Sequence, residues 1–142
     1  MPKKRNVTRT KLFRMVQACW LEDHKFRPTI HDCREVFRNI NNQVFNGELT
    51  MPNFRLVYSK DYWGMCVGHM EDTRKCTIHM NKSFLSKRLF IDTLAHEMVH
   101  QWEWLTNEDM THGRQFFLWK NALAEFGICL SRRYRIKHYK LN

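Results

Sequence analysis

The sequence has few residues that break regular structure and no segment apolar enough to cross a membrane. Its 142 residues include only 5 glycines and 3 prolines, while 43% are hydrophobic, and this composition excludes a disordered or low-complexity chain. No apolar run approaches the roughly 18 residues that a membrane span needs. The first residues are mostly polar and charged, so no secretory signal is expected. These features predict a folded intracellular protein, cytoplasmic or nuclear, with no membrane partner.

The cysteines form no pattern typical of a disulfide framework or a zinc ribbon. Five is an odd number, and no two of them are spaced as C-x-x-C. We therefore expect them to be reduced and mostly buried. A chain of this length supports one domain with a sizeable core but not two. We interpret residues 1–142 as a single domain, and we expect a monomer.

Acidic residues are scarce relative to basic ones. The chain has 24 Lys and Arg against 14 Asp and Glu, a formal net charge of +10, which favours an anionic partner such as nucleic acid. Basic residues gather in residues 1–14 and again in residues 129–142, where tyrosines are interleaved with them. Such segments neutralise phosphates while aromatic rings stack on unpaired bases. The sequence therefore predicts contact with DNA, single-stranded or distorted, through Arg132, Arg133, Tyr134, Arg135, Lys137 and Lys140.

The spacing of apolar residues predicts an α+β protein. Recurrence at three and four residues predicts helices over 8–25, 30–46, about 86–105 and about 114–126. Thr29 and Asp32 form a capping-box pattern at the start of the second helix, and Ser83 or Ser86 can cap the third. Between these two helices, apolar segments predict short strands over 54–58, 63–69 and 76–80. Their connections are short enough for hairpins, so we expect a small, mainly antiparallel sheet.

The third helix carries His96-Glu97-Met98-Val99-His100, the pattern H-E-x-x-H. Residues four apart share one face of a helix, so both imidazoles can reach a single ion. Glu97 lies beside that face, where its carboxylate can accept a proton from a water molecule at the metal. With 8 histidines in the chain, chance predicts only roughly 0.02 such patterns. The pattern predicts one bound Zn²⁺, with Glu97 as general base.

A catalytic zinc needs a third protein ligand, which the helix itself does not supply. The continuation typical of metzincins requires glycine and histidine at the positions of Glu103 and Thr106, so that class is excluded. His112 is the strongest candidate because it is an imidazole placed just before the fourth helix, after a loop that allows this helix to fold back. The alternatives that remain open are the carboxylates of Glu108, Asp109 and Glu125.

Several stretches resemble the SprT-like metallopeptidase family, which includes the Spartan DNA-protein crosslink protease. Residues 92–100 resemble the zinc helix of that family, His112-Gly113-Arg114-Gln115-Phe116 resembles its third-ligand motif, and Trp63-Gly64-Met65-Cys66 resembles the sheet before the zinc helix. Val44-Phe45-Asn46-Gly47-Glu48-Leu49 resembles the junction between helix and sheet. The similarity covers about residues 29–128. Beyond it the chain offers only Cys129, so we interpret it as a minimal form without the zinc ribbon of many members.

The resemblance implies a zincin-like fold, with N-terminal helices, a small sheet, the zinc helix and a following helix that bears a ligand. It implies zinc held by His96, His100 and His112, with Glu97 as the general base. It also implies an endopeptidase that hydrolyses proteins on or near nucleic acid, of the DNA-protein crosslink type. We expect the substrate to bind as an extended strand along a sheet edge, and residues 63–69 are the candidate edge.

Other readings of the same residues stay open. In one, the zinc only braces a nucleic-acid-binding module without turnover. In another, the chain is a peptidase with a processing role unrelated to DNA. Asp92 is either an acceptor that steadies a ligand imidazole or the partner of Arg88 one turn earlier. Candidates for a second group that stabilises the oxyanion are Tyr62, His69, His79 and Tyr134.

Overall fold

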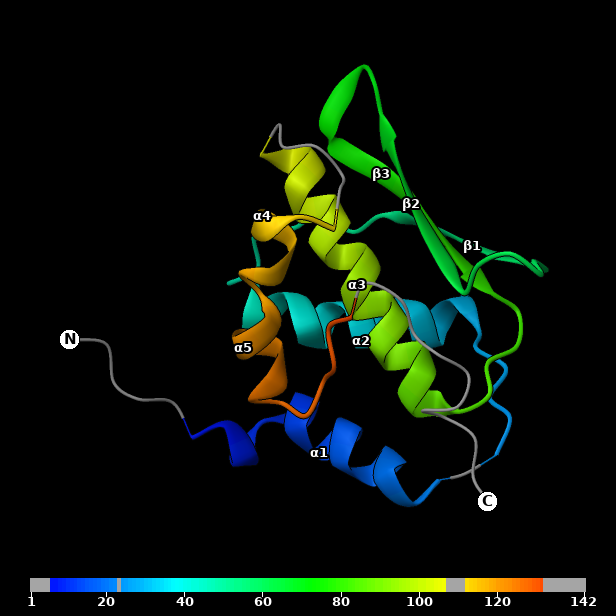
Figure 1. Cartoon of the computed structure of the whole chain (residues 1–142), viewed down its shortest axis with the longest axis vertical. Helices are drawn as coiled ribbons and strands as arrows, with labels where there is room; N and C mark the ends of the chain where they lie inside the picture. The colour runs from blue at the N-terminus through cyan, green and yellow to red at the C-terminus, as the bar shows by residue number, and fades with distance from the viewer. Residues whose placement is uncertain (1–5, 23, 107–111, 132–142) are drawn as a thin grey trace.

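The computed structural model describes residues 6–22, 24–106 and 112–131. The residues predicted to contact DNA, between Arg132 and Lys140, lie outside these ranges, as do Glu108 and Asp109. The described chain is an α+β protein, as the sequence predicts: helices pack on one face of a small sheet (Figure 1).

The N-terminal part forms a 3-10 turn η1 (Val7–Arg9), helix α1 (Lys11–Ala18) and a second 3-10 turn η2 (Cys19–Leu21). The predicted helix was longer, to residue 25, and the structure corrects its end. Phe26 pairs with Phe84 as an isolated antiparallel bridge, with backbone hydrogen bonds of 2.9 and 2.8 Å in the two directions. This pairing requires extended backbone, so the helix ends before it.

Helix α2 (Ile30–Val44) begins with the predicted capping box. The Thr29 hydroxyl accepts the Asp32 N–H at 3.1 Å, while the Asp32 carboxylate accepts the Thr29 N–H at 2.9 Å. The helix ends at the Asn46-Gly47 pair, where both residues have positive φ, a conformation that Gly and Asn adopt most readily. The chain then turns toward the sheet.

Within the described residues, strands β1 (Asn53–Val57), β2 (Gly64–His69) and β3 (Asp72–Asn81) form a mixed sheet of order β1-β3-β2. Strands β2 and β3 are antiparallel, as expected for a hairpin, but β1 runs parallel to β3 at the other edge. The prediction of a mainly antiparallel sheet was therefore wrong for β1. The loop from β1 to β2 does not form a hairpin, because β3 lies between these two strands in the sheet.

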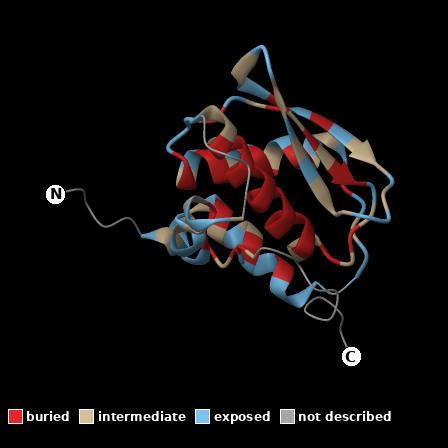
Figure 2. Ribbon diagram, turned by 45° about the horizontal axis from the view of Figure 1, so that its top comes forward, coloured by how far each residue is buried: buried red, intermediate tan, exposed pale blue. Residues whose placement is uncertain are grey.

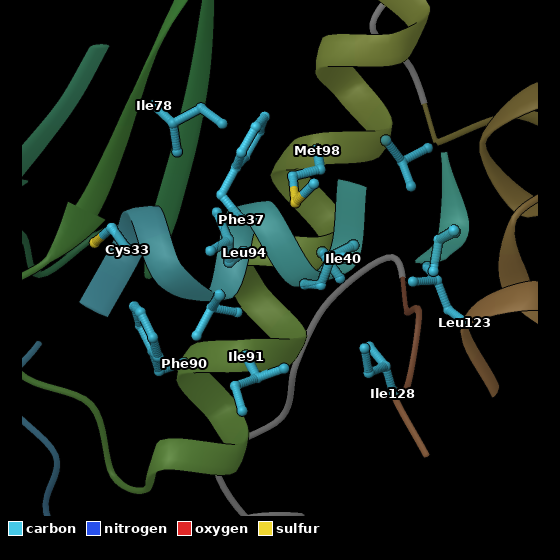
Figure 3. Close-up of a cluster of buried hydrophobic side chains, with 14 of the residues drawn as sticks. Cys33, Phe37, Ile40, Ile78, Phe90, Ile91, Leu94, Met98, Leu123 and Ile128 are labelled. Atoms are coloured by element: carbon cyan, nitrogen blue, oxygen red, sulfur yellow. The ribbon is translucent and has the colours of Figure 1, made fainter. Parts of the chain in front are cut away.

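Helix α3 (Lys87–Leu105) occupies the middle of the molecule. Of the two predicted caps, Ser86 is the one used, and its hydroxyl accepts the Leu89 N–H at 3.1 Å. Every residue from Leu89 to Gln101 is buried, since β2 and β3 cover one side of the helix while α2 and α4 cover others (Figure 2). Polar side chains in this stretch are therefore held in a dry environment. In the core, Leu94 and Met98 of this helix lie among side chains of other elements such as Phe37 and Ile78 (Figure 3).

The last described part forms two short helices, α4 (Arg114–Phe117) and α5 (Lys120–Ala124), where one helix to residue 126 was predicted. Trp119, between them, packs its ring at 4.4 Å from Phe45 and 5.2 Å from Trp102, as measured between centroids. Phe116, one turn earlier, packs against α3 near its histidines. The break lets both aromatic side chains reach their separate contacts.

Candidate metal centre

The imidazoles of His96 and His100 project from the same face of α3, one turn apart, with ring centroids separated by 4.9 Å. Each residue is only 7% exposed. The spacing of four residues sets this arrangement, as the H-E-x-x-H pattern predicts.

His112 lies just before α4 and completes a cluster with these two rings. Its Nε2 atom is 3.0 Å from Nε2 of His96 and 3.2 Å from Nε2 of His100. Of the alternatives to His112, Glu125 is exposed and follows the end of α5, and it is not part of the cluster among the described residues. The structure therefore brings together the three histidines that the sequence singled out, in a group that could hold a metal ion.

The chemistry of this donor set fits zinc. Two nitrogen ligands at 2.0–2.1 Å from one tetrahedral ion lie about 3.3 Å apart, close to the 3.0 and 3.2 Å separations between Nε2 atoms. Burial lowers the pKa of His96 to about 3, with the neighbouring imidazoles adding to the effect. Burial and His112 lower the pKa of His100 to about 4. Both rings are therefore neutral at physiological pH, the form in which imidazole binds a metal.

Each of the two imidazoles on α3 has a hydrogen-bond acceptor at its other ring nitrogen. Nδ1 of His96 is 2.8 Å from the carbonyl oxygen of Ser131, and Nδ1 of His100 is 2.7 Å from a carboxylate oxygen of Glu103. Acceptors at these positions place the proton on Nδ1 and leave the Nε2 lone pair for a metal. Sequence reasoning missed both partners. Glu103 could have been found from its position three residues after His100 on the same helix face, whereas Ser131 is distant in sequence.

Phe116, the last residue of the stretch that resembles the third-ligand motif, is a further residue of the site, although the sequence predicted no role for it. Its ring centroid lies 4.8 Å from that of His96, 5.1 Å from His100 and 5.0 Å from His112. The Phe116 side chain is fully buried. It forms an apolar wall that restricts how the three imidazoles can rotate.

Glu97 lies between the histidine cluster and strand β2. Its Oε2 is 3.9 Å from Nε2 of His96, and the residue is only 5% exposed. Burial raises the pKa of this carboxyl to about 8, while a hydrogen bond from the Cys66 N–H has the opposite effect. Gly64 provides room for the side chain, because a Cβ there would lie 3.1 Å from Cγ of Glu97.

The register of the sheet places two of the candidate oxyanion-stabilising residues away from the metal centre. Ile78 and Met80 of β3 are buried toward the helices, so His79 between them projects from the opposite face. His69 bonds Thr77, which lies on that same opposite face, at 3.0 Å. Tyr62 is partly buried in the loop before β2, and Tyr134 lies outside the described residues. Among the described residues, no hydrogen bond or ring contact joins Tyr62, His69 or His79 to the histidine cluster.

Asp92 is buried one turn before His96, and the structure gives it a backbone partner. Its Oδ1 accepts the N–H of Cys129 at 3.1 Å. The Arg88 guanidinium, the other partner considered, lies over the ring of Trp20 at 4.0 Å from the centroid. Asp92 is thus tied to the segment that follows α5.

An α+β fold with a buried histidine cluster and an adjacent carboxylate defines a metallopeptidase-like module. The sequence matches the model of the SprT-like family over residues 33–138, about three quarters of the chain. The chain therefore belongs to the SprT-like family. No curated protein matches it closely enough for comparison. None of the described helices has the length and hydrophobicity required to span a bilayer.

Proposed function

We propose that this protein is a zinc-dependent endopeptidase, with His96, His100 and His112 as the zinc ligands and Glu97 as the general base. The observation that carries the proposal is the convergence of three Nε2 atoms beside a buried carboxylate, 3.9 Å from the nearest of them. Zinc bound by three imidazoles supplies Lewis acidity that lowers the pKa of water to about 7.

Glu97 is suited to moving the proton of the attacking water. Its pKa, raised by burial to about 8, lies near neutral pH, where a general base both accepts a proton and gives it up again efficiently. The carboxylate would take the proton as the water attacks the scissile carbonyl carbon, and would pass it to the amine nitrogen as the peptide bond breaks. A hydrogen bond from the Cys66 backbone N–H would help to orient the carboxylate.

Strand β2 is suited to binding the substrate as an added strand. It forms one edge of the sheet, and its Cys66 N–H donates to Glu97. The carboxylate therefore lies beside this edge. An extended peptide that pairs with β2 would carry its peptide bonds past Glu97, with affinity supplied mainly by main-chain hydrogen bonds. Met65 and Val67 are partly exposed on this strand and offer apolar contact to alternate side chains.

The test is the Glu97→Gln variant. Glutamine keeps the size of the side chain but has no carboxylate to accept the proton, so we expect cleavage of a disordered test protein such as casein to fall at least 100-fold, the scale of general-base catalysis. Zinc content, measured by atomic emission, should stay at one ion per chain. Cleavage by the variant at the parental rate would refute the mechanism. His112→Ala is the companion variant, which should lose both zinc and activity.

We propose further that the substrates are proteins on or near nucleic acid. The net charge of +10 supports this, together with the basic residues from Arg132 to Lys140. Replacing Arg132, Arg133 and Arg135 by alanine should weaken binding to single-stranded DNA and reduce the dependence of affinity on salt concentration, because each lost phosphate contact releases one counterion fewer. Fluorescence anisotropy at several salt concentrations measures both. Equal affinity and equal salt dependence in parent and variant would favour a processing peptidase unrelated to DNA.

A further inference from the structure

Residues 128–131 form a short segment, called here the strap, which runs from the end of α5 back along α3. Helix α5 is terminated by Gly127, whose φ is +82°; the Gly127 N–H donates to Ala124 at 2.9 Å and the Ile128 N–H to Leu123 at 3.1 Å. Ile128 and Leu130 are buried while Cys129 between them is exposed, the alternation typical of an extended segment. Figure 3 shows Ile128 among the core side chains.

Two hydrogen bonds tie the strap to consecutive turns of α3. The Cys129 N–H donates to Asp92 at 3.1 Å, and the Ser131 carbonyl oxygen is 2.8 Å from Nδ1 of His96. Asp92 and His96 are four residues apart on the helix, a rise of about 6 Å. Cys129 and Ser131 are two residues apart in extended chain, an advance of about 6.6 Å. The spacings match, so a strap anchored at Asp92 brings the Ser131 carbonyl level with the His96 ring.

Asp92 has no role in the proposed chemistry, yet it is a carboxylate with only 1% of its surface exposed. Burying a carboxylate is costly unless it accepts hydrogen bonds. Among the described residues it is outside the histidine cluster, and its Oδ1 is bonded to the strap. The structure therefore connects this buried carboxylate to the histidine cluster through the strap.

We propose that Asp92 is a positioning residue of the metal centre. By holding the strap, it keeps the Ser131 carbonyl against Nδ1 of His96. This contact fixes the tautomer and the orientation in which Nε2 of His96 points toward His100 and His112. The proposal rests on the zinc site of the proposed function, but it does not depend on peptide hydrolysis.

The test compares two variants that remove the anchoring bond from opposite sides, each with a matched control. Asp92→Ala removes the acceptor, while Asp92→Asn keeps an oxygen that can accept the same bond. Cys129→Pro removes the N–H donor, while Cys129→Ala keeps it and, because this side chain is exposed, leaves the core packing unchanged. Thr29→Ala weakens the fold at α2, away from the strap, and controls for a general loss of stability.

Zinc affinity, measured by competition with a chromogenic chelator, should fall about 10- to 100-fold in Asp92→Ala and Cys129→Pro. The visible absorption bands of the Co²⁺-substituted proteins should also change, since the His96 ring loses its orienting acceptor. Asp92→Asn, Cys129→Ala and Thr29→Ala should resemble the parent in both measurements. The double variant Asp92→Ala/Cys129→Pro should lose less zinc affinity than the sum of the two single losses, because both substitutions remove the same hydrogen bond between Asp92 and Cys129.

Parental zinc affinity and a parental Co²⁺ spectrum in Cys129→Pro would overturn the proposal, and this variant decides the question even if Asp92→Ala fails to fold. Loss of affinity in Thr29→Ala to the same degree would also overturn it, because the effect would then follow fold stability. A parent that binds zinc but cleaves equally well as Glu97→Gln would refute the proposed hydrolysis and leave this inference standing. A parent that binds no zinc would overturn both.

Discussion

At the scale of single residues, the candidate site depends on the ring nitrogens of three histidines and on the groups that these nitrogens contact. Three imidazoles converge through Nε2, and the two on α3 are oriented through Nδ1 by Glu103 and Ser131. The H-E-x-x-H pattern was enough to predict His96 and His100 because helical geometry alone places them on one face. Ser131 could not be predicted, because it lies 35 residues from His96 in sequence. Every residue has a backbone carbonyl, so the sequence does not show which carbonyl makes this contact.

Gly64 is the residue whose replacement should most directly displace Glu97. A Cβ at this position would lie 2.8 Å from Cγ2 of Thr93 and 3.1 Å from Cγ of Glu97. We expect Gly64→Ala to reduce cleavage of a disordered protein about 100-fold through displacement of the carboxylate, with zinc content unchanged. Thr93→Ser removes Cγ2, so the double variant should recover part of the activity. Parental activity in Gly64→Ala would show that the carboxylate does not need its observed position.

At the scale of secondary-structure elements, local sequence patterns correctly predicted the features that depend only on residues close together in the chain. The capping box of α2 and the Ser86 cap of α3 are both observed at residues that the sequence indicated as helix caps. Local signals failed where a distant partner imposed the conformation. The N-terminal helix ends early because Phe26 pairs with Phe84, and the last helix is broken because Phe116 and Trp119 pack against different partners.

Helix α2 should contribute to stability independently of the metal centre. Thr29→Ala removes the hydroxyl that accepts the Asp32 N–H, and loss of such a cap costs about 1 kcal/mol of unfolding free energy. Urea denaturation of the metal-free protein measures this loss. Zinc affinity should not change, because the cap touches none of the residues around the histidine cluster. A loss below about 0.3 kcal/mol would indicate that the capping box contributes little to the folded state.

At the scale of the whole molecule, the burial of α3 controls the charge state of the site. The sheet on one side and helices on others keep water from His96 and His100, so their pKa values fall to about 3 and about 4. Ordinary histidine titrates near 6.5. The metal-free protein therefore holds these two imidazoles neutral in the folded state over a pH range in which the unfolded chain protonates them.

This difference predicts how the stability of the metal-free protein depends on pH. Between about pH 6.5 and pH 4 these two histidines bind more protons in the unfolded chain than in the folded one, so their contribution to the free energy of unfolding falls as pH decreases. Glu97, whose pKa is raised to about 8, acts in the opposite direction between about pH 8 and pH 4.5, so the histidine contribution is isolated in the Glu97→Gln variant. The slope is on the order of 1.4 kcal/mol per pH unit for each histidine. Urea denaturation at pH 7, 6 and 5, with zinc removed by chelation, measures it, and His96→Gln should flatten it. Equal stability of the Glu97→Gln variant at pH 7 and pH 5 would contradict the burial argument.

The sequence by itself determined the α+β class, the capped helices, the histidine pair on α3 and, through His112, the third member of the cluster. These features follow from spacing along the chain, which a helix converts directly into position in space. Tertiary structure alone decided that β1 runs parallel to β3, that the last helix breaks, and that Cys129 and Ser131 of the strap bond Asp92 and His96 of α3. These features depend on packing between elements that are far apart in the chain, so no local sequence pattern predicts them.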